Sequence, residues 1–298
     1  MRYLHRFSIK SILALCAMVA LGACREKQPE WQAIGQKLAP LYALKVKPMP
    51  GDWMSQHKEP HQTFDQYVQS KPVRTDGLRN KIYIARIDEF SPKQQEVIAK
   101  TAKYLWLFYG LQVKYLMLDV NTDVFKQSRH YGLEKKLQLS TAYLMNKVLA
   151  KQLPSDAAIL VGLTAADLYP NERWNFVFGQ ASLKNRVGVW SINRFGNPGK
   201  PEEYRKCLLY TIKTATHEIG HAFSLRHCVK YECCMNGSIG LYEASAKPTY
   251  FCPDCLTKIC WNLRQDPKQN LLRTLKFWKE EENRNLTEFY DKNLTVLE

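Results

Sequence analysis

Residues 217–227 read HEIGHAFSLRH, and this short segment constrains the fold and chemistry of the 298-residue chain more than any other. Residues four positions apart share one face of a helix, so His217 and His221 can present two ring nitrogens to one metal ion, with Glu218 beside the open coordination position. His227 is far enough along for the chain to turn and return a third imidazole, which leaves one of zinc's four tetrahedral positions to water. Glu218 can take the proton of such a water as it attacks a peptide carbonyl. The segment therefore predicts a zinc peptidase.

Cysteines follow directly after the third histidine. Cys228-x4-Cys233 and Cys252-x2-Cys255 are two pairs whose spacing suits a closed site of four thiolates, which is structural because no position remains for water. A lone His-Glu-x-x-His pattern also arises by chance on solvated helices, but the third histidine and the two cysteine pairs strengthen the metal interpretation. The sequence therefore predicts two zinc ions, one catalytic and one structural.

The run from His217 to Cys255 resembles the signature of the archaemetzincin family, a branch of the metzincin zinc peptidases. The resemblance implies that the three histidines hold the catalytic zinc, that Glu218 is the general base, and that Met235 forms the Met-turn beneath the metal. It also implies a second zinc held by Cys228, Cys233, Cys252 and Cys255. The resemblance extends from about residue 36 to about residue 265, with further matching stretches at 51–53, 59–60, 62–64, 174–182 and 186–191.

The chain departs from the metzincin pattern at Ser224, where glycine is usual. Glycine permits the sharp turn after the helix, and serine adopts the positive φ of such a turn at a cost of about 1 kcal/mol or more. We expect strain or a shifted turn, with His227 retained as a ligand. No tyrosine stands two residues after Met235, so no residue is assigned to stabilise an oxyanion. Arg226 is a candidate, and a solvated surface arginine is the favoured alternative.

The N-terminus resembles a bacterial lipoprotein signal, because a basic start precedes an apolar run over residues 12–21 and then Gly22-Ala23-Cys24. The run is shorter than the roughly 20 apolar residues of a spanning helix, and the small residues before the cysteine suit cleavage. We expect removal of residues 1–23, lipid on Cys24, and export to the bacterial cell envelope, at the outer rather than the inner membrane. An uncleaved anchor and an ordinary secretory signal are the alternatives.

Three cysteines remain after these assignments, namely Cys207, Cys234 and Cys260. An odd remainder fits poorly with a complete disulfide framework, and thiolates that hold zinc are less available for oxidation, so metal binding is favoured. Cys234 is predicted to be a buried apolar residue, with an alternative role as a ligand.

The chain carries a formal charge of +15, which becomes +12 once the signal's Arg2, Arg6 and Lys10 are removed. Such a charge is also found in nucleic-acid binders. The export signal argues against that partner and favours a membrane surface or acidic envelope polymers, with diffuse solubilising charge as an equal alternative.

The fold class is predicted to be α/β in the α+β, metzincin-like sense: a twisted mixed sheet with an antiparallel edge strand over an active-site helix, and a C-terminal subdomain with the four-cysteine site. Residues 24–80 are predicted to be a tether and N-terminal arm, and residues 81–298 the catalytic domain. Periodicity and turn residues predict strands at 82–87, 113–120, 157–163, 176–183 and 187–192. They predict helices at 38–44, 92–108, 137–153, from 201 through the histidines, 256–262 and 271–290.

The segment before the catalytic helix is assigned a substrate role by resemblance to metzincins. It is expected to be the edge strand above the zinc, where an extended substrate adds its backbone as another strand. A buried strand without substrate contact is the alternative. The residues concerned are Phe176, Val177, Phe178, Gly179, Gln180, Ala181 and Ser182.

These observations together predict a zinc-dependent peptidase that acts on peptide or protein substrates and is anchored to a membrane through Cys24. The alternative is a catalytically idle, zinc-stabilised lipoprotein that holds a peptide in the same cleft. The presence of Glu218, which an idle site does not need, favours the peptidase.

Overall fold

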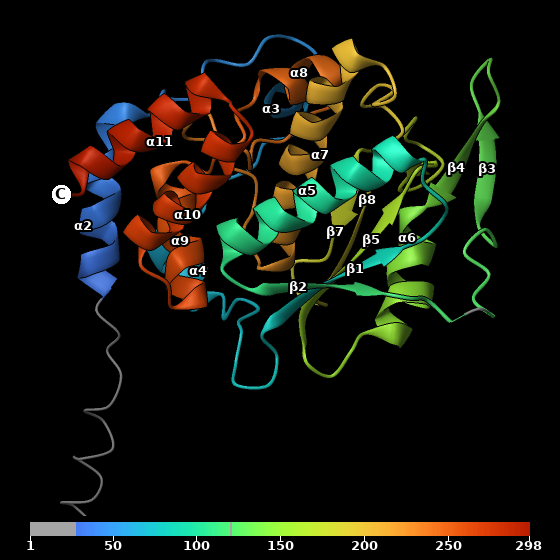
Figure 1. Ribbon diagram of the computed structural model, residues 1–298, viewed down its shortest axis with the longest axis horizontal. Helices are drawn as coiled ribbons and strands as arrows, with labels where there is room; N and C mark the ends of the chain where they lie inside the picture. The colour runs from blue at the N-terminus through green and yellow to red at the C-terminus, as the bar shows by residue number, and fades with distance from the viewer. Residues whose placement is uncertain (1–27, 120) are drawn as a thin grey trace, which may run out of the picture.

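The computed structural model describes residues 28–119 and 121–298. The expected signal peptide and Cys24 lie outside these residues. Within them, no helix is both long and apolar enough to cross a membrane. The described chain builds a central mixed sheet with helices on both faces and a group of C-terminal helices at one side (Figure 1).

The central sheet has the strand order β2-β1-β5-β8-β7. Four strands are parallel, and β7 pairs antiparallel with β8 at the edge. The eight residues of β5 are all buried, as expected for a parallel strand covered on both faces. The predicted mixed sheet with an antiparallel edge strand is confirmed. The strands are β1 (Lys81–Arg86), β2 (Gln112–Leu116), β5 (Ala157–Thr164), β7 (Gly179–Ala181) and β8 (Val187–Ser191).

Alternate residues of β5 divide the core into two layers. Ile159 and Val161 belong to the core shared with α5 (Pro92–Tyr109) and α7 (Pro201–Ala222), whereas Leu160 packs with an irregular helical stretch on the other face. That stretch comprises α6 (Thr141–Tyr143), the π-helical η2 (Leu144–Val148) and the 3₁₀ turn η3 (Leu149–Gln152). Helix α5 begins as predicted, with a capping box at Ser91, and ends at Gly110 in the left-handed region.

The predicted helix at 137–153 is wrong in its first four residues. Residues Lys136–Ser140 form strand β4, which pairs with β3 (Ser128–Tyr131) and β6 (Asp167–Tyr169) in a second, smaller sheet. Leu137 and Leu139 alternate with polar neighbours, a period of two that fits a strand better than a helix. The helical stretch begins only where the Ser140 side chain accepts a hydrogen bond from the amide of Tyr143.

Residues 28–80, which we call the arm, lie partly against the C-terminal helices (Figure 1). Helix α2 (Gln28–Leu38) packs on α9 (Pro253–Leu263), beside α10 (Pro267–Glu280) and α11 (Arg284–Val296). The arm then adds η1 (Ala39–Leu41), α3 (Trp53–Gln56) and α4 (Phe64–Gln69), and the short helix α8 (Leu241–Ala246) follows α7.

Other boundaries also differ from prediction. The helix expected at 38–44 precedes that position, because Pro40 cannot continue a helix and only one 3₁₀ turn follows α2. The helix expected at 271–290 is divided into α10 and α11 at Glu282, whose φ is +51°. Strand β2 ends at Leu116, before the predicted residue 120. Only Gly179–Ala181 of the predicted strand 176–183 is regular strand.

Candidate metal centres

The three predicted histidines converge at the end of α7. His217 and His221 lie on its last turns, and His227 follows on the loop after the helix. One ring nitrogen of each residue lies within 4.8 Å of the corresponding atoms of the other two. The structure therefore brings together residues that a single metal ion could bridge.

Hydrogen bonds determine which nitrogen of each ring is free. Nδ1 of His217 lies 2.8 Å from the carbonyl oxygen of Cys234, and Nδ1 of His221 lies 2.6 Å from that of Leu225. Nδ1 of His227 lies 2.9 Å from a carboxylate oxygen of Glu59. An oxygen of this kind only accepts, so each Nδ1 carries the proton and each Nε2 keeps a lone pair.

The Nε2 atoms of His217 and His221 face each other at 2.9 Å. Two nitrogen lone pairs that face each other at this distance repel. A cation bound by both nitrogens and by His227 would remove this repulsion, so the three imidazoles fit a metal site. Burial, and after it the neighbouring His227, lowers the pKa of His221 to about 3. Burial also lowers the pKa of His217 well below its usual value. Both imidazoles are therefore neutral, which is the form that binds metal.

Glu218 is 4% exposed and projects beside the histidines. Its Oε2 atom is buried and has no hydrogen-bond partner within the described residues. Burial raises the pKa of Glu218 to about 8, and the charge of Lys247 opposes this rise. A cation held by the neighbouring imidazoles would oppose it more strongly and favour the carboxylate. An orphaned carboxyl oxygen at this position is suited to bind a water molecule.

Two glycines, Gly179 on β7 and Gly220 on α7, allow other groups to pack closely at the end of α7 that carries the histidines. A Cβ atom at Gly179 on β7 would lie 2.6 Å from Oε1 of Glu218, so the edge strand passes directly over that carboxyl group. A Cβ atom at Gly220 would lie 2.6 Å from Sδ of Met235, which is fully buried. The structure therefore places Met235 directly against the helix that bears the histidines, where a Met-turn is expected.

Ser224 has the positive φ that makes glycine usual at this position, with a value of +69°. Its Oγ accepts a hydrogen bond from the amide of Val73 at 3.0 Å and donates one to the carbonyl of Leu183 at 2.7 Å. These two bonds offset part of the cost of the left-handed conformation. His227 reaches the other two histidines, as expected for a retained ligand.

A cavity with a volume of about 570 Å³ lies between the histidines and the edge strand. Its lining includes the catalytic-helix residues and the expected substrate segment from Phe176 to Ala181. Gln180 is exposed on β7, whereas Ser182 lies in the following turn, where its amide donates to the carbonyl of Val187. Arg226, an oxyanion candidate from sequence, is exposed at the rim of this cavity.

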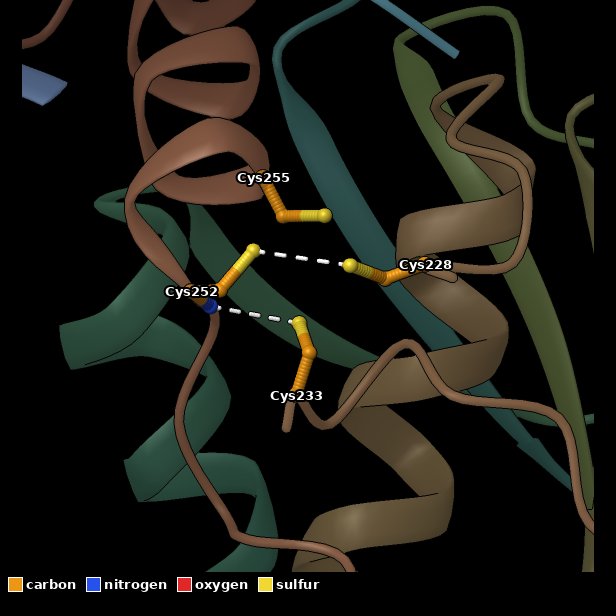
Figure 2. A group of neighbouring side chains, drawn as sticks. All are labelled: Cys228, Cys233, Cys252 and Cys255. Atoms are coloured by element: carbon orange, nitrogen blue, oxygen red, sulfur yellow. Dashed lines mark hydrogen bonds between the residues drawn. The ribbon is translucent and has the colours of Figure 1, made fainter. Parts of the chain in front are cut away.

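The four predicted cysteines form a second cluster, and their side chains point toward one centre (Figure 2). Cys228 and Cys233 come from the loop after α7, and Cys252 and Cys255 from the start of α9. Sγ of Cys228 and Sγ of Cys252 lie 3.6 Å apart. A disulfide requires about 2.05 Å, whereas a tetrahedral zinc with bonds of about 2.3 Å separates its sulfurs by about 3.8 Å.

The surroundings of this cluster suit thiolates. Sγ of Cys233 accepts hydrogen bonds from the amides of Met235 at 3.4 Å and Cys252 at 3.2 Å. All four residues are buried, and none lines the cavity beside the histidines. Cys234 lies outside the cluster, with its thiol 3.3 Å from the carbonyl of Lys213, in agreement with the predicted buried apolar role. The donor set therefore fits a closed metal site.

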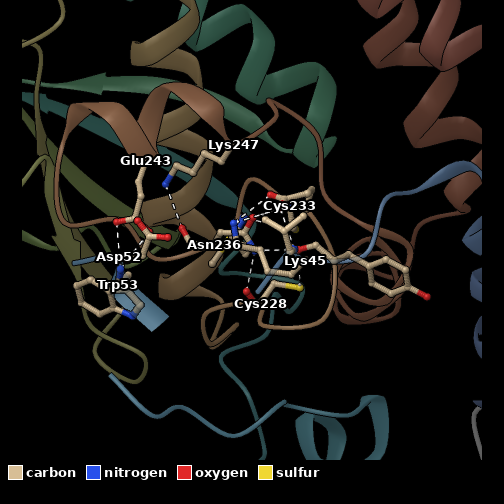
Figure 3. Close-up of polar contacts among 12 residues, drawn as sticks. Lys45, Asp52, Trp53, Cys228, Cys233, Asn236, Glu243 and Lys247 are labelled. Carbon is tan, nitrogen blue, oxygen red and sulfur yellow. Dashed lines mark hydrogen bonds and ion pairs between the residues drawn. The ribbon is translucent and has the colours of Figure 1, made fainter. Parts of the chain in front are cut away.

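Three residues beside the histidine site were not given roles from the sequence. Glu59 and Trp53 of the arm contact His227, and Lys247 lines the cavity. Lys247 is 7% exposed, and its Nζ donates to the carbonyl of Asn236 at 3.2 Å (Figure 3). The stretches 51–53 and 59–60 resemble the family pattern, but no spacing rule connects residues so distant from the histidines.

Comparison with known proteins gives a consistent result. Residues 156–260 match the family model described as Peptidase family M54. Archaemetzincin-2 of Homo sapiens is 38% identical over 244 residues, which cover 70% of this chain and 67% of the relative. Archaemetzincin-2 of Mus musculus is 34% identical over 247 residues with the same coverage. The crystal structure of archaemetzincin from Methanopyrus kandleri matches with a TM-score of 0.50 and 27% identity, covering 63% of this chain and 98% of that one.

Proposed function

The chain belongs to the archaemetzincin family and is a zinc metallopeptidase, and on this basis we propose that it hydrolyses peptide bonds with Glu218 as the general base. The proposal rests mainly on one observation: the Nε2 atoms of the three histidines converge beside Oε2 of Glu218, which has no hydrogen-bond partner within the described residues. These groups line a cavity that β7 borders.

Each residue has a stated task in this mechanism. His217, His221 and His227 would hold the zinc, which when bound polarises a carbonyl and makes water acidic enough to be deprotonated near pH 7. Glu218 takes the proton of the attacking water and passes it to the departing amine. Its position against Gly179 holds the carboxyl group under the edge strand, so the base and the substrate backbone lie on the same side of the helix.

Substrate binding is assigned to the unpaired edge of β7. Among the described residues this strand pairs with β8 alone, and its three residues line the cavity. An extended peptide would pair with that edge and present a carbonyl above Glu218. Peptides or proteins are therefore the substrate class.

The four-cysteine cluster would hold a second zinc with a structural role, because its sulfurs are buried and offer no position for water. We also propose that Cys24 carries lipid and anchors the protein at the bacterial cell envelope, in the outer membrane. This anchor rests on the sequence pattern of residues 1–24 alone. Incorporation of a labelled fatty acid in a bacterial host tests it, with label expected on the natural chain and absent from Cys24→Ser.

The peptidase mechanism is tested by digestion of a diverse peptide library, read by mass spectrometry, with the zinc-loaded protein beside Glu218→Gln. Both proteins should contain the same amount of zinc. We expect the variant to lose about 10²- to 10⁴-fold in cleavage rate, the usual contribution of a general base. Equal rates would exclude Glu218 as the base. If neither protein cleaves while both bind peptide, the idle binding protein replaces the peptidase.

A further inference from the structure

The arm holds the turn that carries the third histidine. Side chains and one amide of the arm satisfy polar groups along residues 223–226. Tyr67 donates to the carbonyl of Phe223 at 2.6 Å, and Gln62 donates to the carbonyl of Ser224 at 3.3 Å and accepts from the amide of Arg226 at 3.1 Å. The amide of Val73 donates to Oγ of Ser224. The backbone of this turn is therefore fixed by residues distant in sequence.

His227 differs from the other two histidines in the partner of its Nδ1 atom. His217 and His221 donate to backbone carbonyls of the same region of the chain, at sequence separations of 17 and 4 residues. His227 donates to the carboxylate of Glu59, with both oxygens within 3.0 Å, across 168 residues. A backbone carbonyl persists in any side-chain variant, whereas this partner is a side chain that a single substitution removes.

Glu59 is itself held in place. Nε1 of Trp53 donates to its Oε2 at 3.2 Å, and the Trp53 ring meets His227 edge to face with centroids 4.9 Å apart. The backbone amide of Trp53 donates to the carboxylate of Glu243 at 3.0 and 3.1 Å (Figure 3). Glu243 also accepts from the amide of Ile239 at 2.9 Å, on the segment after Met235. The arm is thus connected to His227 and, through Glu243, to the segment that follows Met235.

We propose that Glu59 is a positioning residue that orients His227 and determines how tightly the histidine site holds its metal, so that the arm forms part of the metal centre. This inference rests on the proposed zinc-binding role of the three histidines. A carboxylate that accepts the second N–H of a ligating histidine fixes the ring and increases its basicity, and removal of such a partner costs about 10- to 100-fold in metal affinity.

The test measures the zinc dissociation constant of the histidine site in the full chain by competition with a chromogenic chelator at fixed pH and salt. Glu59→Ala removes the acceptor, and we expect zinc binding about 10- to 100-fold weaker. Glu59→Gln keeps an oxygen acceptor without the charge and should lie between Glu59→Ala and the natural chain. Asp65→Asn is the matched control, because it removes an exposed arm carboxylate that bonds Gln32 and does not line the cavity beside the histidines.

A purely structural role is distinguished by the melting temperature of proteins that keep zinc only at the cysteine cluster, and by the retention of that zinc. We expect both to remain unchanged in the Glu59 variants that lose zinc affinity at the histidine site. If Glu59→Ala does not fold, Trp53→Phe removes the Nε1 donor to Glu59, keeps an aromatic ring at that position, and should weaken zinc binding by a smaller factor. Zinc affinity in Glu59→Ala equal to that of Asp65→Asn would overturn the inference.

A separate variant distinguishes this inference from the proposed function. His227→Ala should lose zinc from the histidine site entirely. If it binds zinc as the natural chain does, the ligand assignment fails and the inference fails with it. If His227→Ala loses zinc while Glu59→Ala keeps full affinity, only the role of Glu59 is refuted.

Discussion

The histidine cluster and the cysteine cluster lie on adjacent parts of one chain and are built in opposite ways. The four cysteines all come from residues 228–255 and are buried, and Sγ of Cys233 accepts hydrogen bonds from two amides of the same segment. The histidines border a cavity of about 570 Å³, and the third one depends on the arm. A closed metal site can be built from residues that are close together in the sequence. An open metal site also needs residues from distant segments, because they form the cavity that binds the substrate.

The largest difference between the two clusters is expected when one ligand is removed from each. Cys252→Ser should prevent stable folding, because zinc bound at a structural site contributes several kcal/mol or more to the free energy of folding. His227→Ala should remain folded, because its removal leaves the core and the cysteine cluster intact. Near-UV circular dichroism and zinc content distinguish the two variants. A folded Cys252→Ser protein would contradict the structural role of the second cluster.

A smaller effect is expected where the edge strand crosses the catalytic helix. Gly179→Ala would place a Cβ atom 2.6 Å from Oε1 of Glu218 and displace the carboxyl group. We expect kcat/KM to fall by about 10- to 100-fold with zinc content unchanged, because small misplacements of a catalytic group have effects of this size. Gly77→Ala is the control, since no heavy atom lies within 4 Å of the added Cβ. Equal activities of the two variants would show that Glu218 tolerates displacement.

The smallest effects are expected at Ser224, which connects the arm to the turn after β7. Ser224→Ala keeps the positive φ and loses two hydrogen bonds, so we expect the free energy of unfolding to fall by about 2 kcal/mol. Ser224→Gly loses the same bonds but relieves about 1 kcal/mol of backbone strain, so a net loss of about 1 kcal/mol is expected. Urea titration measures both. A glycine variant less stable than the alanine variant would contradict this account.

The parts that sequence predicts well are those set by neighbours along the chain. The spacing of His217 and His221, the boundaries of α5 and α7, and the two cysteine pairs all depend on local periodicity or short spacing. The strand at 136–140 was misread because its two leucines also fit a helical pattern that continues into residues 141–152.

The contribution of Glu59 and Trp53 could not be predicted, for a different reason. Glu59 contacts His227 and Trp53 contacts Glu243, each more than 160 residues away, and a sequence pattern cannot predict contacts at such a separation. Only the tertiary structure brings the arm to the turn at 223–227. The positive φ of Ser224 was foreseen as a strain, but the two hydrogen bonds that offset it come from Val73 and Leu183, which only the tertiary structure brings together.

The separation of Glu59 from His227 also bears on the order of assembly during folding. Closing a flexible loop costs free energy that grows as about (3/2)RT ln n, so a 168-residue loop costs about 1.7 kcal/mol more than the 24-residue loop between Cys228 and Cys252. Chain entropy thus favours closure of the sulfur cluster first and completion of the histidine site last. The chain can acquire its structural metal as a folding nucleus before its hydrolytic centre is complete.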